Sequence, residues 1–384
     1  MEKFCKLVFV SQDNHNKYYS MNWDGKSDMV NVEYGRIDLT CQKTTFHISL
    51  WESKYREKLK KGYVDCTTLV SVNEVQELKQ IGNSKVAALI ELLKRYRDNL
   101  VRNTYSVKAT SITPQQIQKA QEILSDIAVS SSLSEVEVNK KLIALYTTIP
   151  RNMNKVQHHL LPSIDLNRTL QSEQDNIDAV KSSVSVNTAS TELKTDTTLL
   201  DVLGITIEEC TDTTELNYLL KQNFGRKVEA IYCLNKASEN ETFDNWMQKQ
   251  KNKETRVLIH GTRCSSVLGI FQYGLKIRPS GNFQFSGKVY GDSNYFSMLF
   301  SKSLGYCGHD NDKMILVYEV HTGNPYTYKG WRRKEKDDFD LNYQELQKRG
   351  YDSLFVEAGD GLLHSEICAY NEEQCRIKYL IHIK

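Results

Sequence analysis

The hydrophobic pattern of this sequence changes its period along the chain, which no single secondary-structure type can accommodate. Between residue 84 and about residue 181, apolar residues recur at helical spacing, as in Val86, Leu89, Ile90 and Leu93. Residues at i, i+3, i+4 and i+7 form one face of an amphipathic helix. The flanking segments carry short apolar runs between loops, which indicate strands. We therefore expect the 384 residues to fold as about two or three domains.

The helical segment also contains signals for where its helices begin and end. Thr113 and Gln116 stand where a helix would have its N-cap and the partner residue of a capping box. The apolar face of the helix that follows is expected at Ile117, Ala120, Leu124, Ile127 and Ala128. Another helix is predicted to begin near Ser134 and to end before Pro150. Because such faces bury one another, residues 80–182 are expected to form an α-helical bundle.

Residues 1–75 have the pattern of a small β-rich domain. They are rich in Tyr, Val and Phe, and residues 22–25 and 34–36 interrupt the short apolar runs as turns would. A short helix is predicted over residues 51–62, which end in a glycine. This helix contains two acidic residues, Glu52 and Glu57, and five basic ones: Lys54, Arg56, Lys58, Lys60 and Lys61. Such a charge run either forms a solvated face or contacts phosphate.

The remainder of the chain changes character again. Residues 183–198 are dominated by Ser, Thr and Asp and are expected to form a linker. In residues 199–384, short apolar runs alternate with loops and short helices, without regular β-α alternation. This texture favours an α+β domain with mixed or antiparallel sheets over a doubly wound one. The whole chain is thus expected to be multidomain, with a β-rich, an all-α and an α+β part.

Composition excludes several classes of protein. The net charge is +2, from 50 Lys and Arg against 48 Asp and Glu, which excludes a strongly basic coat for non-specific nucleic-acid binding. The apolar run at residues 7–10 is too short for a signal peptide. No stretch approaches the roughly 20 apolar residues that span a bilayer. We expect a soluble protein made in the cytosol, with no membrane partner.

Several familiar motifs are missing or imperfect. The nine cysteines include no C-x-x-C pair, which argues against zinc ribbons and a disulfide framework, so reduced and mostly buried thiols are expected. Residues 281–288 resemble a phosphate-binding loop, but five residues separate the glycines instead of four, so a flexible loop is expected. The sequence has no His-Glu-x-x-His, EF-hand or Gly-x-Ser-x-Gly motif. No metal site is expected.

Three fragments in the last third of the chain belong together: 258–262 (LIHGT), 294–306 (NYFSMLFSKSLGY) and 362–370 (LLHSEICAY). Their order and texture resemble the catalytic domain of the poly(ADP-ribose) polymerases, with its His-Tyr-Glu signature. Residues 113–150 are similar to the helical regulatory domain of the DNA-dependent members. Residues 17–68 are similar to the Trp-Gly-Arg domain that precedes it. The resemblance covers nearly the whole chain, in the family's own order.

The resemblance implies an enzyme that consumes NAD as a substrate and transfers its ADP-ribose to proteins. Cleavage of the bond between nicotinamide and ribose passes through an oxocarbenium-like sugar, as in glycoside hydrolysis. Such an enzyme must hold the leaving nicotinamide and place negative charge near the ribose, where positive charge develops. The chemistry therefore needs a clamp, aromatic walls and a carboxylate.

By this resemblance, six residues would bind NAD: His260, Gly261, Tyr295, Lys302, Ser303 and Tyr306. Gly261 would clamp the nicotinamide amide with its backbone N–H and C=O, and Ser303 would add a hydroxyl hydrogen bond. Tyr306 would stack on the nicotinamide ring, while Tyr295 would close the opposite wall. His260 would hydrogen-bond the adenosine ribose.

The resemblance makes Glu366, His260 and Tyr295 the catalytic residues, although several of these residues also have a structural interpretation. Glu366 would bind the 2′-OH of the nicotinamide ribose, stabilise the cation and polarise the acceptor hydroxyl during chain extension. Lys302 would contact the acceptor or the pyrophosphate. Taken singly, His260 could be a structural histidine, Tyr295 and Tyr306 could be core aromatics, and Glu366 could face solvent on a strand.

The resemblance also implies a DNA-binding and regulatory role for the first two domains. A strand break would engage Tyr34, Arg36 and the basic residues of the helix predicted at 51–62, and this would loosen the bundle and admit NAD. Tyr34 replaces the Trp of the Trp-Gly-Arg motif, which keeps an aromatic face of smaller area. Where the family has Gly-Lys-Gly-Ile before the Tyr, this chain has GDSN at 291–294. The zinc fingers of the largest family members are not expected, since no two cysteines form a C-x-x-C pair.

The expected partners are broken DNA, acceptor proteins that include the enzyme itself, and an accessory protein that completes the acceptor site. Two alternatives stay open: a mono-ADP-ribosyltransferase, and a catalytically weak scaffold that binds DNA breaks. Glu366 favours chain elongation, whereas Asp292 and Ser293 leave room for the scaffold. We expect the nucleus if the host is eukaryotic and the cytoplasm otherwise, with residues 332–334 (RRK) as a weak nuclear-signal candidate.

Overall fold

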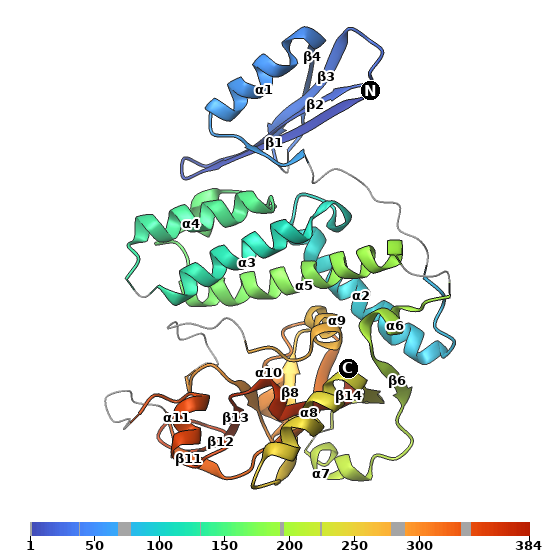
Figure 1. The fold of residues 1–384 in the computed structure, drawn as a ribbon, viewed down its shortest axis with the longest axis vertical. Coiled ribbons are helices and arrows are strands. Elements are labelled where there is room, and N and C mark those ends of the chain that lie inside the picture. The colour runs from blue at the N-terminus through green and yellow to red at the C-terminus, as the bar shows by residue number, and fades with distance from the viewer. Residues whose placement is uncertain are drawn as a thin grey trace. The chain divides into compact units, whose positions relative to one another are not determined.

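The computed structural model describes residues 2–37, 39–67, 78–130, 132–192, 196–222, 225–277, 289–331 and 339–384 (Figure 1). The chain divides into two units, each described by itself below. Unit 1 comprises the described residues of 1–76 and 98–191, and unit 2 comprises those of 77–97, 192–280 and 284–384. One helix, α2 (Ser84–Thr104), contributes its first part to unit 2 and its last part to unit 1.

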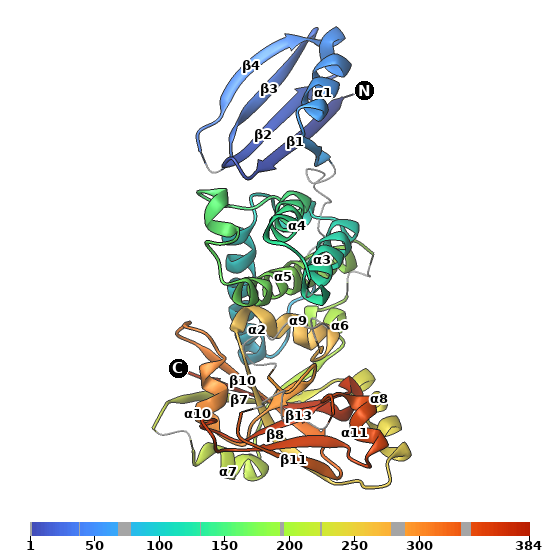
Figure 2. The same ribbon diagram turned by 90° about the vertical axis from the view of Figure 1, so that its left-hand side faces the viewer.

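Unit 1 begins with a five-stranded antiparallel sheet in the order β4-β3-β2-β1-β5 (Figure 2). Its strands are β1 (Lys3–Ser11), β2 (His15–Trp23), β3 (Met29–Arg36), β4 (Gln42–His47) and β5 (Val64–Asp65). The helix α1 (Trp51–Lys60) contributes Trp51 to a core that includes Leu7, Met21 and Val32. Residues 34–36, expected to interrupt the strands, continue β3, because Gly35 pairs with Tyr18 of β2.

The helices of unit 1 begin where local capping signals place them. They are the last part of α2, then α3 (Pro114–Val129), α4 (Glu135–Thr148) and α5 (Leu166–Glu192). Thr113 and Gln116 form a capping box at α3, and Ser134 forms another at α4. The predicted apolar face of α3 is buried, with Leu124 fully buried. None of the helices in the described ranges has the length and hydropathy that a bilayer span requires.

The linker predicted at 183–198 is wrong for most of its length, since α5 continues to Glu192. Val184 and Val186 are 6% and 7% exposed, so the buried side of α5 extends beyond Val180. Burial of an apolar face contributes more to helix stability in proteins than the modest propensity penalty of Ser and Thr. Residues 193–195 lie outside the described residues.

Unit 2 is built on two sheets, which agrees with the α+β expectation. A five-stranded sheet has the order β6-β7-β14-β10-β8, and a four-stranded sheet has the order β11-β12-β13-β9. The strands are β6 (Thr206–Glu209), β7 (Val228–Asn235), β8 (Thr255–Thr262), β9 (Asn294–Phe296), β10 (Lys313–His321), β11 (Pro325–Lys329), β12 (Ser353–Glu357), β13 (Glu366–Ala369) and β14 (Cys375–Ile383). The paired strands are antiparallel except for β11 and β12, which are parallel.

Short helices cover these sheets: α6 (Leu199–Leu203), α7 (Asn217–Leu220), α8 (Ala237–Lys249), α9 (Cys264–Tyr273), α10 (Phe300–Gly305) and α11 (Tyr343–Lys348). The two sheets meet where Ile259 of β8 and Ser297, just after β9, exchange two N–H···O hydrogen bonds of 2.9 Å. Ile259 and Phe300 are fully buried in the same core cluster. This junction brings β8, β9 and α10 together, and with them the predicted site residues.

Candidate active site

The strand β8 carries His260 and Gly261 past the junction of the two sheets. Ile259 uses its backbone N–H and C=O to bond Ser297. Backbone direction alternates along a strand, so Gly261, two residues further, directs its N–H and C=O toward the same edge of β8. A planar amide could therefore bond both groups of Gly261, which fits the predicted nicotinamide clamp.

Gly261 is also required by its protein neighbours. A Cβ atom added at this position would overlap the carbonyl oxygen of Ser303 and lie 2.6 Å from its carbonyl carbon. The helix α10 thus approaches β8 at a distance that only glycine permits. The Ser303 side chain is almost fully buried, and its Oγ lies 3.5 Å from the carbonyl oxygen of Ile259. Gly261 and Ser303 are therefore brought together.

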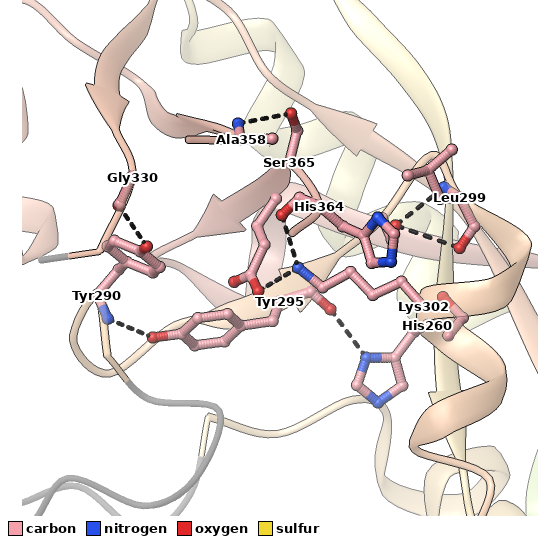
Figure 3. A network of polar contacts seen from close by, with 12 residues as sticks. His260, Tyr290, Tyr295, Leu299, Lys302, Gly330, Ala358, His364 and Ser365 are labelled. Atoms are coloured by element: carbon pink, nitrogen blue, oxygen red, sulfur yellow. Dashed lines mark hydrogen bonds and ion pairs between the residues drawn. The ribbon is translucent and has the colours of Figure 1, made fainter. Parts of the chain in front are cut away.

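His260 is fixed by the neighbouring sheet. Its Nδ1 lies 3.0 Å from the carbonyl oxygen of Tyr295 (Figure 3). Its ring meets that of Phe296 edge-on, at 6.2 Å between centroids. A carbonyl oxygen only accepts, so Nδ1 carries the proton and Nε2 is the acceptor of the neutral ring. Burial lowers the pKa of His260, which keeps the ring neutral near pH 7. A neutral Nε2 suits a hydrogen bond from a sugar hydroxyl.

Tyr295 forms a rigid wall of the site. Its hydroxyl donates to the carbonyl oxygen of Gly291 at 2.9 Å and accepts from the backbone N–H of Tyr290 at 2.9 Å. Tyr295 lies opposite Cys368 in the pairing of β9 with β13. Burial raises the pKa of Tyr295 well above its usual range, so the hydroxyl remains a neutral donor. The ring orientation is thus set before any ligand binds.

Glu366 and Lys302 form an ion pair beside these residues. Lys302 Nζ bonds Glu366 Oε1 and also donates to the carbonyl oxygen of His364 at 3.3 Å (Figure 3). The Lys302 and Glu366 side chains are only 12% and 10% exposed. This burial argues against the structural interpretation, in which Glu366 would face solvent. The negative charge is held at the first residue of β13, with a counter-charge that fixes its orientation.

A tight turn leads into Glu366. Gly359 and Leu362 exchange two backbone hydrogen bonds of 3.0 and 2.8 Å. The backbone of Gly361 has φ of +91°, a conformation that favours glycine. Ser365 Oγ accepts from the Ala358 N–H at 3.0 Å. The turn fixes the start of β13, and hence the height of the Glu366 carboxylate above the sheet.

Tyr306 differs from the other aromatic residue of the set. It is the C-cap of α10 and is 51% exposed, so it is not a core aromatic. An exposed ring at the end of the helix that carries Lys302 and Ser303 is free to stack on a planar ligand. Its position at the end of α10 fits the predicted role.

The sequence did not indicate that Tyr290 holds the segment before β9 in place. The Tyr290 hydroxyl donates to the carbonyl oxygen of Gly330 at 2.7 Å, and Tyr370 donates to the carbonyl oxygen of Tyr290. These bonds join the segment before β9 to the segments after β11 and β13. Hydrogen bonds between positions 40 and 80 residues apart leave no local signal in the sequence. The loop at 281–288 lies outside the described residues.

The predicted DNA-binding residues lie in unit 1 and make contacts of their own. The Tyr34 ring lies 6.2 Å from that of Tyr19 and packs against the sheet core. Arg36 donates to the carbonyl oxygen of Asn14 at 2.7 Å, to Asn14 Oδ1 at 3.0 Å, and to the carbonyl oxygen of Asn154. Arg36 thus connects the turn between β1 and β2 to the segment after α4. Its guanidinium group is engaged by protein atoms in this structure.

The five basic residues of α1 and its end are not equivalent. Lys54 and Lys61 pair with Glu57 at 3.3 and 2.6 Å. Lys58 lies over the Tyr19 ring, 4.1 Å from its centroid. Arg56 and Lys60 are exposed. The last two therefore carry the positive charge of this helix that is most available to a phosphate.

Comparisons with known proteins agree with this geometry. Residues 208–384 match the family model described as the poly(ADP-ribose) polymerase catalytic domain. The chain is 51% identical over 174 residues to a poly(ADP-ribose) polymerase-like protein, 100L, of Invertebrate iridescent virus 6, which spans 45% of this chain and 95% of that protein. The chain belongs to the poly(ADP-ribose) polymerase family. It is an NAD+ ADP-ribosyltransferase, a family member in which NAD is the substrate.

Two further relatives align with different shares of this polymerase-family chain. Uncharacterized protein 101L of the same virus is 39% identical over 189 residues, 49% of this chain and 80% of that protein. Poly [ADP-ribose] polymerase 1 of Danio rerio is 23% identical over 426 residues, 100% of this chain and 39% of that protein. The alignment with the fish polymerase thus runs through both units of this enzyme.

Proposed function

We propose that this enzyme is a poly(ADP-ribose) polymerase that DNA strand breaks activate. It would transfer ADP-ribose from NAD to acceptor proteins, itself included, extend the chain and release nicotinamide. The observation that supports elongation is the buried carboxylate of Glu366, oriented by Lys302 beside Tyr295 and His260. A carboxylate so held is able to activate a sugar hydroxyl as the next acceptor.

The proposed reaction follows from what each group can do. Gly261 binds the nicotinamide amide with its backbone N–H and C=O, while Tyr306 and Tyr295 enclose the ring. As the C1′–N bond breaks, its electron pair leaves with nicotinamide, and the Glu366 carboxylate stabilises the positive charge on the ribose. The acceptor oxygen then forms the new bond to C1′, and its proton passes to Glu366 or to solvent. His260 Nε2 accepts from the adenosine ribose.

The DNA part of the proposal rests on unit 1. Arg56 and Lys60 are exposed on α1, and Tyr34 and Arg36 end β3 on the same unit. Binding of a strand break by these residues would loosen the helices and admit NAD. Broken DNA, acceptor proteins and an accessory protein at the acceptor site are the proposed partners. A nuclear location in a eukaryotic host belongs to the same proposal; residues 332–334 lie outside the described residues.

The enzymatic part is tested with labelled NAD on a denaturing gel, with and without nicked duplex DNA. We expect a high-mass smear that requires DNA and disappears in Glu366→Gln. Glu372→Gln, a half-exposed carboxylate in the same unit that also pairs with a lysine, is the matched control and should keep the smear. A single sharp band would indicate a mono-ADP-ribosyltransferase. No label, with DNA still bound, would indicate a scaffold.

The DNA part is tested by anisotropy of a labelled nicked duplex over a range of salt. Each phosphate contact contributes about 0.9 to the slope of log affinity against log salt concentration. Arg56→Ala with Lys60→Ala should therefore reduce the slope by about 1.8. The matched control is Lys249→Ala with Lys251→Ala, two exposed lysines of unit 2. An equal effect in both pairs would argue against a binding surface on α1.

A further inference from the structure

Two cysteines of unit 2 lie side by side, far from the residues that bind NAD in the proposal. Cys210 directly follows β6, and Cys233 lies in β7. Cys233 pairs with Glu208, two residues before Cys210, so both side chains lie on the same face of the sheet. The Cys210 N–H donates to the carbonyl oxygen of Ile231 at 2.9 Å, which fixes the strand ends. Both side chains are partly exposed.

The distance between the two sulfurs is unusually short. It is 2.7 Å, whereas non-bonded heavy atoms rest at roughly 3.5–4.0 Å and a disulfide bond measures about 2.05 Å. The backbone therefore already brings the two Sγ atoms close to bonding distance. Six of the other cysteines are buried, and Cys41 is partly exposed, like the two cysteines of the pair.

We propose that Cys210 and Cys233 form a redox-sensitive pair, which a peroxide converts to an intrachain disulfide. The Cys210 sulfur attacks one peroxide oxygen, the O–O bond breaks, and one water leaves, so that Cys210 becomes a sulfenic acid. The Cys233 sulfur then attacks the Cys210 sulfur, the S–O bond breaks, and a second water leaves. The two thiols lose two electrons and two hydrogens in all, and hydrogen peroxide becomes two waters.

The hydrogen bonds around the pair assign the order of attack. The Cys233 thiol donates to the Cys210 sulfur, and the Cys210 thiol donates to the carbonyl oxygen of Asp212 at 3.0 Å. Burial, the bond to Cys210 and nearby carboxylates raise the pKa of Cys233 to about 12. A thiol with such a pKa is a poor first nucleophile. Cys210 therefore reacts with the oxidant, and Cys233 resolves the sulfenic acid because its sulfur already lies beside that of Cys210.

The disulfide would secure a segment on which the catalytic core depends. The chain between the two cysteines carries Leu216 and Leu219, which are fully buried in the same cluster as Ile259 and Phe300. Ile259 precedes His260, and Phe300 begins α10. The cross-link joins β6, at one edge of the sheet, to β7, while β8 lies at the opposite edge. Oxidation should therefore stabilise unit 2 without obstructing the NAD-binding strand.

The test uses the full chain, reduced and then treated with hydrogen peroxide. We expect wild type to lose about 2 Da in intact mass and to yield a Cys210–Cys233 cross-linked peptide, both reversed by dithiothreitol. Its melting temperature should rise by roughly 5–10 °C. Cys210→Ser and Cys233→Ser should each abolish these changes, whereas Cys41→Ser should retain them.

Two results would overturn the proposal. One is a 2 Da loss of equal yield in Cys210→Ser, which would assign the disulfide to other thiols. The other is a wild-type chain that gains oxygen atoms on Cys210 without losing about 2 Da, which would mean that the pair does not close. NAD turnover of each reduced variant, compared with reduced wild type, shows that the serine variants fold.

Discussion

Breaking the ion pair between Lys302 and Glu366 is expected to destabilise unit 2 far more than breaking an exposed pair. Their side chains are 12% and 10% exposed, so Lys302→Met leaves a buried carboxylate without its counter-charge. Loss of one partner of a buried pair costs about 3–5 kcal/mol. In the matched control, Lys276 and Glu372 are 39% and 37% exposed, and Lys276→Met should cost less than about 1 kcal/mol.

The double variant Lys302→Met with Glu366→Gln separates the charge effect from the loss of packing. It removes both charges and leaves a neutral amide, so it should recover most of the stability that Lys302→Met loses. The carbonyl oxygen of His364 still loses its donor at 3.3 Å, which leaves a residual cost of about 1 kcal/mol. The difference between the double variant and the sum of the single variants is the coupling free energy of the pair.

The assay is calorimetric melting, in which the transition of unit 2 is identified by its upward shift with nicotinamide. For a unit of this size, 1 kcal/mol changes the melting temperature by about 2–4 °C. Lys302→Met should therefore lower it by at least about 6 °C, and Lys276→Met by less than about 4 °C. Equal shifts in Lys302→Met and Lys276→Met would refute the reasoning, and so would a double variant no more stable than Lys302→Met.

Other parts of unit 2 give predictions of different kinds. Gly261→Ala should lower the melting temperature and abolish NAD turnover, because the methyl group would overlap a main-chain carbonyl of α10; a normal melting curve would contradict this. Burial raises the pKa of Asp312, but hydrogen bonds from His382 and Tyr96 outweigh it, so its folded pKa is lowered. Asp312 therefore stabilises the fold above its unfolded pKa and loses this effect as pH falls through the folded pKa. Asp312→Asn should flatten the decline of melting temperature below about pH 5. Tyr306→Ala should melt normally, since the ring is 51% exposed, while initial rates show a KM for NAD raised about fivefold.

Local signals in the sequence predicted much of the secondary structure. Thr113 and Ser134 cap α3 and α4 as expected, because a capping box involves residues only three positions apart. The apolar runs of residues 199–384 correspond to strands, and their irregular spacing correctly indicated an α+β domain. The capping boxes are local to their helices, whereas the strands are completed by distant partners, as where Met314 of β10 pairs with Thr262 of β8.

Two local predictions were wrong because burial and strand pairing outweigh the local preference of single residues. The polar run after residue 183 reads as a linker, but buried Val184 and Val186 hold it in α5. Tyr34 and Arg36 stand next to a glycine, as turn residues often do, but pairing with β2 keeps them in β3. The signals that decide these outcomes are the two apolar residues within the polar run and the strand that directly precedes β3, and they outweigh the polar and glycine residues.

The candidate site was predicted as a set of residues, but the bonds among them were not. His260 bonds a carbonyl 35 positions away, and Lys302 bonds a carboxylate 64 positions away. Such pairs depend on the junction of Ile259 with Ser297, which fixes how one sheet of unit 2 lies against the other. Sequence fragments identify which side chains can do the chemistry; the register between sheets determines which of them meet.

Gly261 shows why these two sources of information are complementary. The resemblance assigns the glycine to close approach of a ligand, whereas the geometry gives it a second cause, the carbonyl of Ser303 on α10. Both requirements come from the same contact between α10 and β8. The helix must lie against this strand if Ser303 and Tyr306 are to reach the edge toward which the Gly261 backbone points. A larger residue at position 261 would move the helix before it touched a ligand. The packing of α10 on β8 therefore brings Ser303 against the Gly261 backbone, and glycine is the residue that permits this packing.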